Sequence, residues 1–254
     1  MDLELRGKSI LVTGGGSGIG AAITEVLSAE GAKVTILSRS SPPADFLAKT
    51  GADFIAVELS DDAACAAALA QAQKTSGPFY GLVNNAGAND GVGLDKGPQA
   101  FRQSLDQNLL HYYTMVHLLA DDLRKTRGAI VNISSKTALT GQGGTSAYVA
   151  AKAAALGLTR EWAVDFLPDQ VRVNAIIVAE VMTPLYERWL ASLPDPAAKL
   201  AEITRKIPLG QRMTKAREIA DSCAFLLSPR ASHTTGQWLY VDGGYSHLDR
   251  ALSG

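Results

Sequence analysis

The chain has 254 residues, 46% of them hydrophobic, and a net charge of −1 at neutral pH. This length allows one large domain with a substantial core. The near-zero charge gives no reason to expect nucleic acid or an anionic membrane as a partner. The two cysteines, Cys65 and Cys223, make no disulfide framework or metal-ligand pattern, so we expect no metal. The polar start and the lack of a bilayer-length apolar run predict a cytoplasmic protein with no membrane partner.

Short runs rich in valine and isoleucine alternate with longer amphipathic segments along the chain. Most of the runs lack polar alternation and therefore predict strands buried on both faces, as in a parallel sheet. The seven predicted strands are Ser9–Val12, Lys33–Leu37, Asp53–Val57, Gly81–Val83, Gly128–Ile133, Arg172–Ile177 and Trp238–Val241. The predicted helices include Ile19–Ala29, Asp61–Thr75, Pro98–Leu123, Ala147–Phe166 and Lys215–Leu227. This alternation predicts an α/β fold: a doubly wound (Rossmann) parallel seven-stranded sheet with helices on both faces, in a single domain over residues 1–254.

A glycine-rich loop follows the first predicted strand and leads into a helix. Such a loop presents backbone N–H groups and a positive helix end to a dinucleotide pyrophosphate. The common G-x-G-x-x-G spacing does not fit from Gly14, because Ile19 falls at its last position. We nevertheless assign the loop to cofactor binding, because the strand before it and the helix after it are correctly placed. Its candidate contacts are Gly14, Ser17, Gly18, Ile19 and Gly20.

The second predicted strand ends in Ser38 and Arg39, without a carboxylate. In this fold an acid near that point usually holds a ribose 2′-hydroxyl, whereas an arginine accommodates a 2′-phosphate. The guanidinium of Arg39 can bind a phosphate through charge-assisted hydrogen bonds, and Ser38 can add another. The sequence therefore predicts NADP(H) as the preferred cofactor, with NAD(H) as the other candidate.

Tyr148 and Lys152 lie four residues apart in a predicted helix, on the same face. A neighbouring ammonium favours the ionised form of a phenol, so Lys152 is expected to lower the pKa of Tyr148. Such a pair can exchange a proton with a substrate hydroxyl or carbonyl. A Tyr-x-x-x-Lys pair alone also occurs by chance on ordinary helices.

These segments together resemble the short-chain dehydrogenase/reductase family over nearly the whole chain. The resemblance is carried by motifs in the family's order and spacing: Thr13-Gly14-x-x-x-Gly18-Ile19-Gly20, Asn84-Asn85-Ala86-Gly87, Ser134-Ser135, Tyr148-x-x-x-Lys152, Asn174-Ala175-Ile176 and Val241-Asp242-Gly243-Gly244-Tyr245. Asn108, in the long central helix, matches the family's catalytic asparagine. One departure follows Asn174-Ala175-Ile176, where Val178-Ala179 replaces the family's usual Pro-Gly and alters the nicotinamide wall.

The resemblance implies a role for each of the four catalytic residues. Tyr148 is the expected general acid/base, and Lys152 lowers its pKa and holds the nicotinamide ribose. Ser135 stabilises the developing charge on the reacting oxygen, and Asn108 holds a water that relays protons to Lys152. Hydride passes between nicotinamide and a hydroxyl or carbonyl carbon. The remaining cofactor contacts implied by the resemblance are Glu58, Leu59, Asn85, Ala86, Gly87, Tyr148, Lys152, Val181 and Thr183.

Polar residues gather on the segments expected to border the substrate pocket. With Ser135 and Tyr148, they make a predicted substrate site suited to a polyhydroxylated small molecule. The additional residues are Asn89, Asp90, His111, Lys136, Gln142 and Glu180. The chain also resembles the family's bacterial sugar dehydrogenases, in particular L-fucose dehydrogenase-like members. That resemblance implies oxidation of an aldose such as L-fucose to its lactone.

Two other functions remain open at this point. One is a 3-oxoacyl thioester or other carbonyl reductase on the same scaffold, although the polar pocket disfavours an acyl chain. The other is a non-catalytic regulator that senses NADP(H), which would be expected to lack Ser135, Tyr148 or Lys152.

The long connection at about residues 183–212 is interpreted as a substrate-lid insertion, with a helical excursion that only packs on the surface as the alternative. The family resemblance implies a homotetramer. The tail Ser246–Gly254 is a candidate to reach a neighbouring subunit's pocket, with fraying as the alternative.

Overall fold

Seven parallel strands form one sheet in the order β3-β2-β1-β4-β5-β6-β7. The computed structural model describes residues 1–248 of the chain, so most of the predicted tail contact lies outside the described residues. The strand bounds are β1 (Ser9–Thr13), β2 (Lys33–Ser38), β3 (Asp53–Ala56), β4 (Gly81–Asn84), β5 (Ala129–Ser135), β6 (Arg172–Val178) and β7 (Trp238–Val241). The order reverses direction between β1 and β4, which places a crevice for ligands at the carboxyl ends of these strands. The predicted doubly wound fold is confirmed.

Burial along the strands follows their position in the sheet. All residues of β1, β4, β5 and β6 are buried, as expected for strands covered on both faces. The edge strands β3 and β7 have no fully buried residue. The continuous buried runs therefore mark the interior strands, including most of β2.

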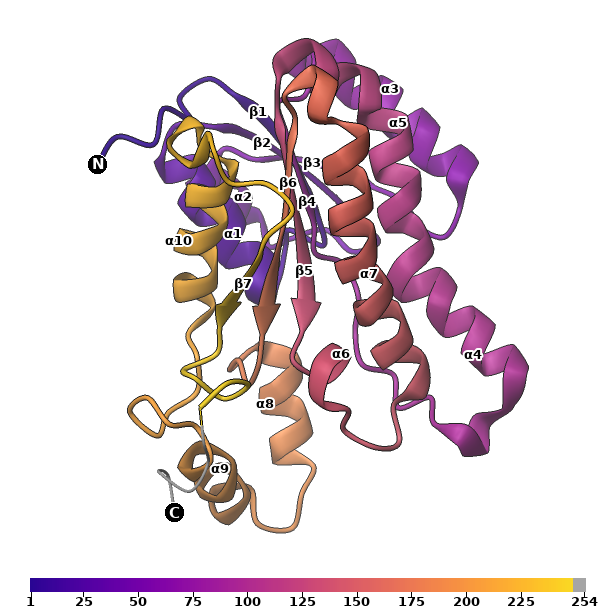
Figure 1. Cartoon of the computed structure of the whole chain (residues 1–254), viewed down its shortest axis with the longest axis vertical. Helices are drawn as coiled ribbons and strands as arrows, with labels where there is room; N and C mark the ends of the chain where they lie inside the picture. The colour runs from indigo at the N-terminus through magenta and orange to yellow at the C-terminus, as the bar shows by residue number, and fades with distance from the viewer. Residues whose placement is uncertain (249–254) are drawn as a thin grey trace.

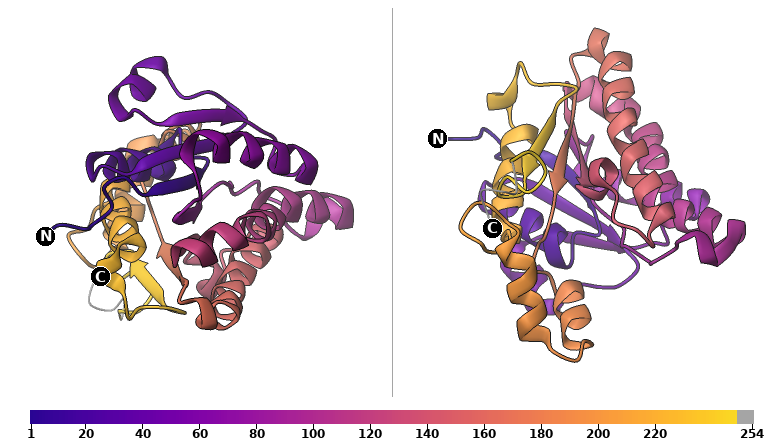
Figure 2. Two further views of the ribbon diagram at one scale, coloured as in Figure 1. Left: turned by 90° about the horizontal axis from the view of Figure 1, so that it is seen from above. Right: turned by 60° about the horizontal axis from the view of Figure 1, so that its bottom comes forward.

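Helices cover both faces of the sheet (Figures 1 and 2). On one face lie α1 (Gly18–Ala29), α2 (Ala44–Thr50) and α10 (Ala216–Leu227). On the other lie α3 (Asp62–Ser76), α4 (Gly97–Leu105), α5 (His111–Thr126) and α7 (Ser146–Asp165). Two large apolar cores result, one around Ile23 and Leu227 and the other around Met115 and Phe79, with a third, small cluster at Leu156 and Ile177.

The long central helix differs from its prediction. The sequence predicts one helix over Pro98–Leu123, but the structure has α4, a π-helical turn at Asp106–Leu110 and then α5. A π turn adds one residue to the helical repeat and rotates everything that follows it, and such turns are frequent at functional sites. Asn108 lies in this turn. The short helix α2 lies between the second and third strands, where the sequence predicts no helix.

The predicted lid region contains two helices beyond the carboxyl ends of the strands, α8 (Pro184–Ala191) and α9 (Pro196–Arg205) (Figure 1). Thr183 caps α8 by accepting a hydrogen bond from Tyr186 N at 3.3 Å, and Asp195 caps α9. The segment is therefore an ordered helical excursion next to the site. Within residues 1–248, no helix is both long and apolar enough to cross a membrane.

Candidate active site

Thr13, at the end of β1, joins the cofactor loop to the end of β4. Its Oγ1 accepts hydrogen bonds from Asn85 N at 2.9 Å and Ala86 N at 3.1 Å. The Asn85 side chain donates back to the carbonyl oxygen of Thr13 at 2.9 Å and, at 3.3 Å, to that of Gly14. These bonds fix the two strand ends that border the crevice, and they explain why the two motifs occur together in the sequence.

The glycine loop has the close packing that a dinucleotide cradle needs. Gly14 has a φ of +65°, and a Cβ there would lie 3.1 Å from Ala86 Cα. A Cβ on Gly20 would lie 2.1 Å from Gly14 O, so only glycine allows the start of α1 to pack this closely on the loop. Ser17, the N-cap of α1, makes no side-chain cap hydrogen bond, which leaves the N–H groups of the first turn available to an anion. These features fit a pyrophosphate.

The end of β2 offers a cation for the ribose side of a cofactor. Arg39 Nη1 lies 3.7 Å from Glu58 Oε2, and both side chains are largely exposed. An exposed pair at this distance is weak and can be opened by a phosphate, which is the stronger partner for a guanidinium. Ser38 Oγ donates to Ser40 O, and so it now stabilises the loop. The residues present therefore fit NADP(H).

Asn108, Gly87 and Lys152 meet beside the π turn. Asn108 Oδ1 accepts a hydrogen bond from Ala88 N at 2.8 Å, and its Nδ2 donates to Ser104 O at 3.1 Å. A Cβ on Gly87 would lie 2.8 Å from Asn108 Oδ1 and 3.6 Å from Lys152 Nζ. The Asn108 amide thus fixes the backbone after β4 and makes no direct hydrogen bond to Lys152.

Lys152 is buried and is held by two acceptors. Its Nζ donates to Tyr112 OH at 2.8 Å and to Ile133 O at 2.9 Å, and it lies 5.7 Å from the centroid of the Tyr148 ring. Ser134 Oγ donates to Lys152 O at 2.8 Å and so anchors α7 to β5. Burial lowers the pKa of Lys152 to about 7, because desolvation disfavours the ammonium.

Tyr148 and Ser135 face each other across the junction of α7 and β5. Ser135 Oγ accepts hydrogen bonds from Thr137 N at 3.3 Å and Thr137 Oγ1 at 3.0 Å. Burial raises the pKa of Tyr148 to about 12, and a hydrogen bond with Ser135 opposes that rise. The net pKa of Tyr148 is therefore raised, not lowered, because desolvation of the phenol outweighs any lowering by the Lys152 ammonium. Desolvation weakens the lysine's own charge, and its two hydrogen bonds point it at Tyr112 and Ile133.

A second polar cluster lies at the ends of β5 and β6. Lys136 Nζ pairs with Glu180 Oε1, and Tyr186 OH on α8 donates to Glu180 Oε2 at 2.8 Å. The Lys136 ammonium also lies 3.8 Å from the centroid of the Tyr245 ring. Burial, followed by the Glu180 charge, raises the pKa of Tyr186 well above its usual value. The cluster joins four separate segments next to Ser135.

The other predicted substrate residues are arranged differently. Asn89 and Asp90 are exposed, and their side chains accept hydrogen bonds from Gly91 N and Val92 N within their own loop. Gln142 is exposed in the loop before α7. None of these three contacts the Lys136–Glu180 cluster, and all three lie in exposed loops.

His111 is predicted as a substrate residue, and the structure places it in the interior, near enough to Lys152 to be affected by its charge. His111 is buried, its Nε2 lies 3.1 Å from Gln107 O, and it lines a small cavity with Leu59 and Tyr113. Burial, and then the nearby Lys152, lowers the pKa of His111 to about 4. The π turn removes the simple three-residue spacing from Asn108 on which the prediction of His111 depended.

Sequence reasoning missed Tyr112, Tyr186 and Tyr245 as site residues. The position of Tyr186 is partly predictable, because it lies in the first turn of α8, after the Thr183 cap. The contact of Tyr112 with Lys152 joins residues 40 positions apart and depends on how α5 packs beside α7, for which the sequence carries no signal.

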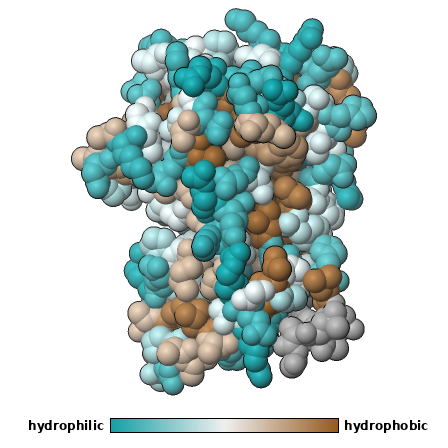
Figure 3. Space-filling model, turned by 90° about the vertical axis from the view of Figure 1, so that its left-hand side faces the viewer, coloured by the Kyte–Doolittle hydropathy of each residue, from teal (hydrophilic) through white to brown (hydrophobic). Residues whose placement is uncertain are grey.

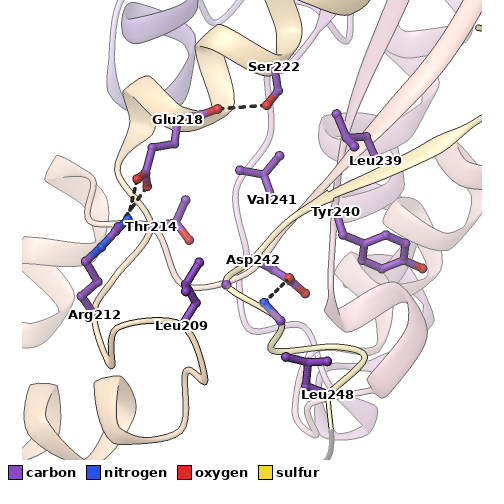
Figure 4. Close-up of a pocket in the computed structure, with 12 residues that line it drawn as sticks. Leu209, Arg212, Thr214, Glu218, Ser222, Leu239, Tyr240, Val241, Asp242 and Leu248 are labelled. Carbon is purple, nitrogen blue, oxygen red and sulfur yellow. Dashed lines mark hydrogen bonds and ion pairs between the residues drawn. The ribbon is translucent and has the colours of Figure 1, made fainter.

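A pocket of about 570 Å³ lies away from these residues, between α10 and β7 (Figure 4). Arg212 and Glu218 pair on one side of it, and Leu239, Asp242 and Leu248 lie on the other. It contains no predicted catalytic residue, so size alone does not mark the reactive site. Among residues 1–248, no group of three or more His, Cys, Asp or Glu residues is placed to hold a metal ion.

A short-chain dehydrogenase family model, described as enoyl-(acyl carrier protein) reductase, matches residues 14–246. The L-fucose dehydrogenase of Bos taurus is 36% identical over 248 residues, which cover 96% of this chain and 91% of the bovine protein. The chain belongs to the short-chain dehydrogenase/reductase family. L-xylulose reductase of Bos taurus is 38% identical over 250 residues, covering 96% of this chain and 99% of that protein. The crystal structure of Cj0485 dehydrogenase matches with a TM-score of 0.97 and 46% identity over 99% of both chains.

Membership of the short-chain dehydrogenase/reductase family makes the protein an oxidoreductase that uses NAD(P)(H) and acts on a small molecule. The site contains the residue types that this chemistry needs: a phenol, a serine hydroxyl and a lysine on adjoining elements. Bound nicotinamide supplies the hydride transfer itself.

Proposed function

We propose that this protein is an NADP-dependent dehydrogenase that oxidises the anomeric hydroxyl of an aldose such as L-fucose, giving the lactone. The observation that carries the substrate class is the pairing of Lys136 with Glu180 beside Ser135. A partly buried ammonium and carboxylate offer several donors and acceptors to a molecule with many hydroxyls, and they disfavour an acyl chain that would leave them unpaired. Relatives named as L-fucose dehydrogenase give independent support.

The proposed proton chemistry uses three side chains. Tyr148, as a phenolate, accepts the proton of the sugar hydroxyl. Ser135 donates a hydrogen bond to the same oxygen and holds it toward the phenol. Lys152 donates two of its three N–H groups to Tyr112 and Ile133, and in this proposal the third faces the nicotinamide ribose and Tyr148. The raised pKa of Tyr148 means that phenolate formation limits oxidation near neutral pH.

The proposed preference for NADP(H) depends on Arg39. In this proposal the 2′-phosphate displaces Glu58 from the guanidinium, and Ser38 turns from Ser40 toward it. The pyrophosphate lies on the glycine loop and the first turn of α1. In this proposal Val181 and Thr183 border the carboxamide. Thr183 packs against Gly18, because a Cβ added to Gly18 would lie 3.3 Å from Thr183 Cγ2.

A second candidate is reduction of a sugar carbonyl by the same residues. The relative named L-xylulose reductase, which is 38% identical, favours this direction. The cofactor side is the same for both candidates, and only the preferred substrate differs.

We further propose that α8 and α9 act as a substrate lid and that the protein is a cytoplasmic homotetramer. Tyr186 on α8 is hydrogen-bonded to Glu180, so a substrate that binds Glu180 would change the position of that helix. Exposed apolar side chains on α5 and α7, such as Tyr113 and Val164, favour helix-to-helix contact between copies. The face around α10 is mixed, with apolar side chains between polar ones (Figure 3).

The test is a spectrophotometric assay of the purified protein with NADP⁺ or NAD⁺ and a panel of aldoses, with lactone identified by mass spectrometry. We expect reduced NADP to form with L-fucose or a related aldose. Turnover of a 3-oxoacyl thioester or a steroid with no turnover of any sugar would overturn the substrate assignment. Turnover of L-xylulose with NADPH alone would favour the second candidate.

A further inference from the structure

Lys152 has a protein partner that the sequence motifs do not include. Tyr112, on α5, is fully buried, and its hydroxyl accepts a hydrogen bond from Lys152 Nζ at 2.8 Å. The same hydroxyl donates to Ile133 O at 3.0 Å, and Lys152 donates to that carbonyl at 2.9 Å. Three groups from α5, α7 and β5 therefore close a hydrogen-bonded triangle behind the active site.

The triangle fixes the direction of each hydrogen bond. A tyrosine hydroxyl has one proton, and here it is committed to Ile133 O, so Tyr112 can only accept from Lys152. An ammonium has three donors, of which Tyr112 and Ile133 take two. The third is left for the side facing Tyr148, whose ring centroid is 5.7 Å from Nζ.

Asn108 does not make this connection. Its amide is engaged by Ala88 N and Ser104 O. The family resemblance implies a link to Lys152 through a water held by Asn108. What the structure contains is a direct hydrogen bond from Lys152 to the Tyr112 hydroxyl. We propose that Tyr112 is a positioning residue of the active site, which holds the Lys152 ammonium by a direct hydrogen bond and directs its remaining N–H toward Tyr148 and the nicotinamide ribose. This inference builds on the proposed function.

In the described part of the chain, few titratable groups surround Lys152, so a change in its pKa can be attributed to Tyr112. The titratable groups facing it are Tyr148 from its own helix and Tyr112 and His111 from α5, and β5 presents the Ile133 carbonyl. Burial keeps the pKa of His111 at about 4, so that ring is neutral above about pH 5. A hydrogen bond accepted from an ammonium favours the charged form. Removing the Tyr112 hydroxyl therefore leaves a buried ammonium with less support.

The experiment compares Tyr112→Phe with Tyr113→Phe. Tyr113 is the next residue on α5 and is 58% exposed, so its variant is a matched control. The Lys152 titration is followed by NMR of the cofactor-free protein with ¹³Cε-labelled lysine, and Lys152→Met assigns the signal. We expect the midpoint in Tyr112→Phe to fall by about one pH unit and that in Tyr113→Phe to stay within about 0.2. An unchanged midpoint in Tyr112→Phe would overturn the proposal.

Steady-state kinetics give the second readout. We expect Tyr112→Phe to lower kcat for oxidation about tenfold near neutral pH, to leave the substrate KM within about twofold, and to move the rising limb of the pH–rate profile to higher pH. Phe keeps the ring in its apolar surroundings, and thermal unfolding checks that the variant folds. A uniform loss of activity with no pH displacement would show a structural role only, and would refute the proposal. Because the NMR titration needs no turnover, failure to oxidise any sugar would refute the proposed function and still leave the role of Tyr112 to be decided.

Discussion

Lys136 and Glu180 form a nearly buried ion pair between the ends of β5 and β6, and Tyr186 from α8 adds a hydrogen bond to the same carboxylate. Each residue thus fixes the other's position beside Ser135. Because the pair lies at the carboxyl edge of the sheet, where this fold binds ligands, its charges are available to a substrate. A carboxylate that accepts from both an ammonium and a phenol is held in place, and in the proposed function this would favour selection among sugar stereoisomers.

Replacing Glu180 by Gln tests this assignment. We expect the KM for the aldose to rise about 10- to 100-fold, because a charge-assisted hydrogen bond to the sugar is lost, while the Kd for NADP⁺ changes less than about twofold. Fluorescence titration measures the cofactor and steady-state kinetics the sugar. Glu187→Gln, on the exposed face of α8, serves as the matched control and should leave both unchanged. An unchanged sugar KM in Glu180→Gln would exclude the pair from substrate binding.

The cofactor preference is tested at Arg39. We expect Arg39→Ala to weaken NADP⁺ binding about 10- to 100-fold and to leave NAD⁺ binding nearly unchanged, because only the 2′-phosphate pairs with the guanidinium. Equilibrium binding of both cofactors measures this. Arg102→Ala, at an exposed site on α4, controls for loss of a surface charge. Equal weakening of both cofactors would show that Arg39 stabilises the loop and does not read the phosphate.

The role of Tyr148 is tested by Tyr148→Phe. We expect kcat to fall at least about 10³-fold, since Tyr148 is the phenol that is hydrogen-bonded to Ser135, while NADP⁺ binding stays within about threefold. In the wild type, oxidation should accelerate as pH rises toward the raised pKa of Tyr148, because the phenolate is the reactive form. Stopped-flow measurements separate the chemical step from cofactor binding. Retention of more than about a tenth of kcat would refute the assigned role.

Much of the fold was predictable because its signals are local. The seven strands were found within two residues at each end, since buried parallel strands are continuous apolar runs. The π turn at Asp106–Leu110 was not predictable, because the residues there have ordinary helical propensities and the extra residue is imposed by packing. That single turn also changes the spacing between Asn108 and His111 along the helix.

The residues of the catalytic motif were predictable from the sequence, but the directions of their pKa shifts were not. Tyr148 and Lys152 are recognisable from their spacing, and the structure brings Ser135 and Asn108 to the same crevice edge. The pKa directions of Tyr148 and Lys152 are set chiefly by burial, and a spacing rule includes neither burial nor the hydrogen bond from Lys152 to Tyr112. The Lys136–Glu180 pair was found as two polar residues, but its closure depends on β5 and β6 being neighbours in the sheet.

The buried ammonium of Lys152 is expected to make stability depend on pH. Burial lowers its pKa from 10.5 to about 7, so between these values the unfolded chain holds more protons than the folded one. The free energy of unfolding therefore rises with pH in that window. Lys152→Met removes the titrating group, so folding of this variant no longer requires the desolvation of an ammonium. We expect its stability relative to the wild type to be greatest below pH 7 and to decline steadily as pH rises toward 10.

Urea unfolding at about pH 6 and about pH 9 measures this difference, which we expect to be about 2 kcal/mol larger at the lower pH. The matched control is Lys74→Met near the end of α3, where the side chain is exposed and the variant should differ from the wild type equally at both values. The hydrogen bond to Tyr112 favours the ammonium, so its pH-dependent part is already contained in the folded-state pKa of Lys152. If the advantage of Lys152→Met were constant or grew with pH, Lys152 would be charged in the folded protein throughout the range. The Tyr112 hydroxyl and Ile133 carbonyl would then stabilise the ammonium more strongly than burial opposes it.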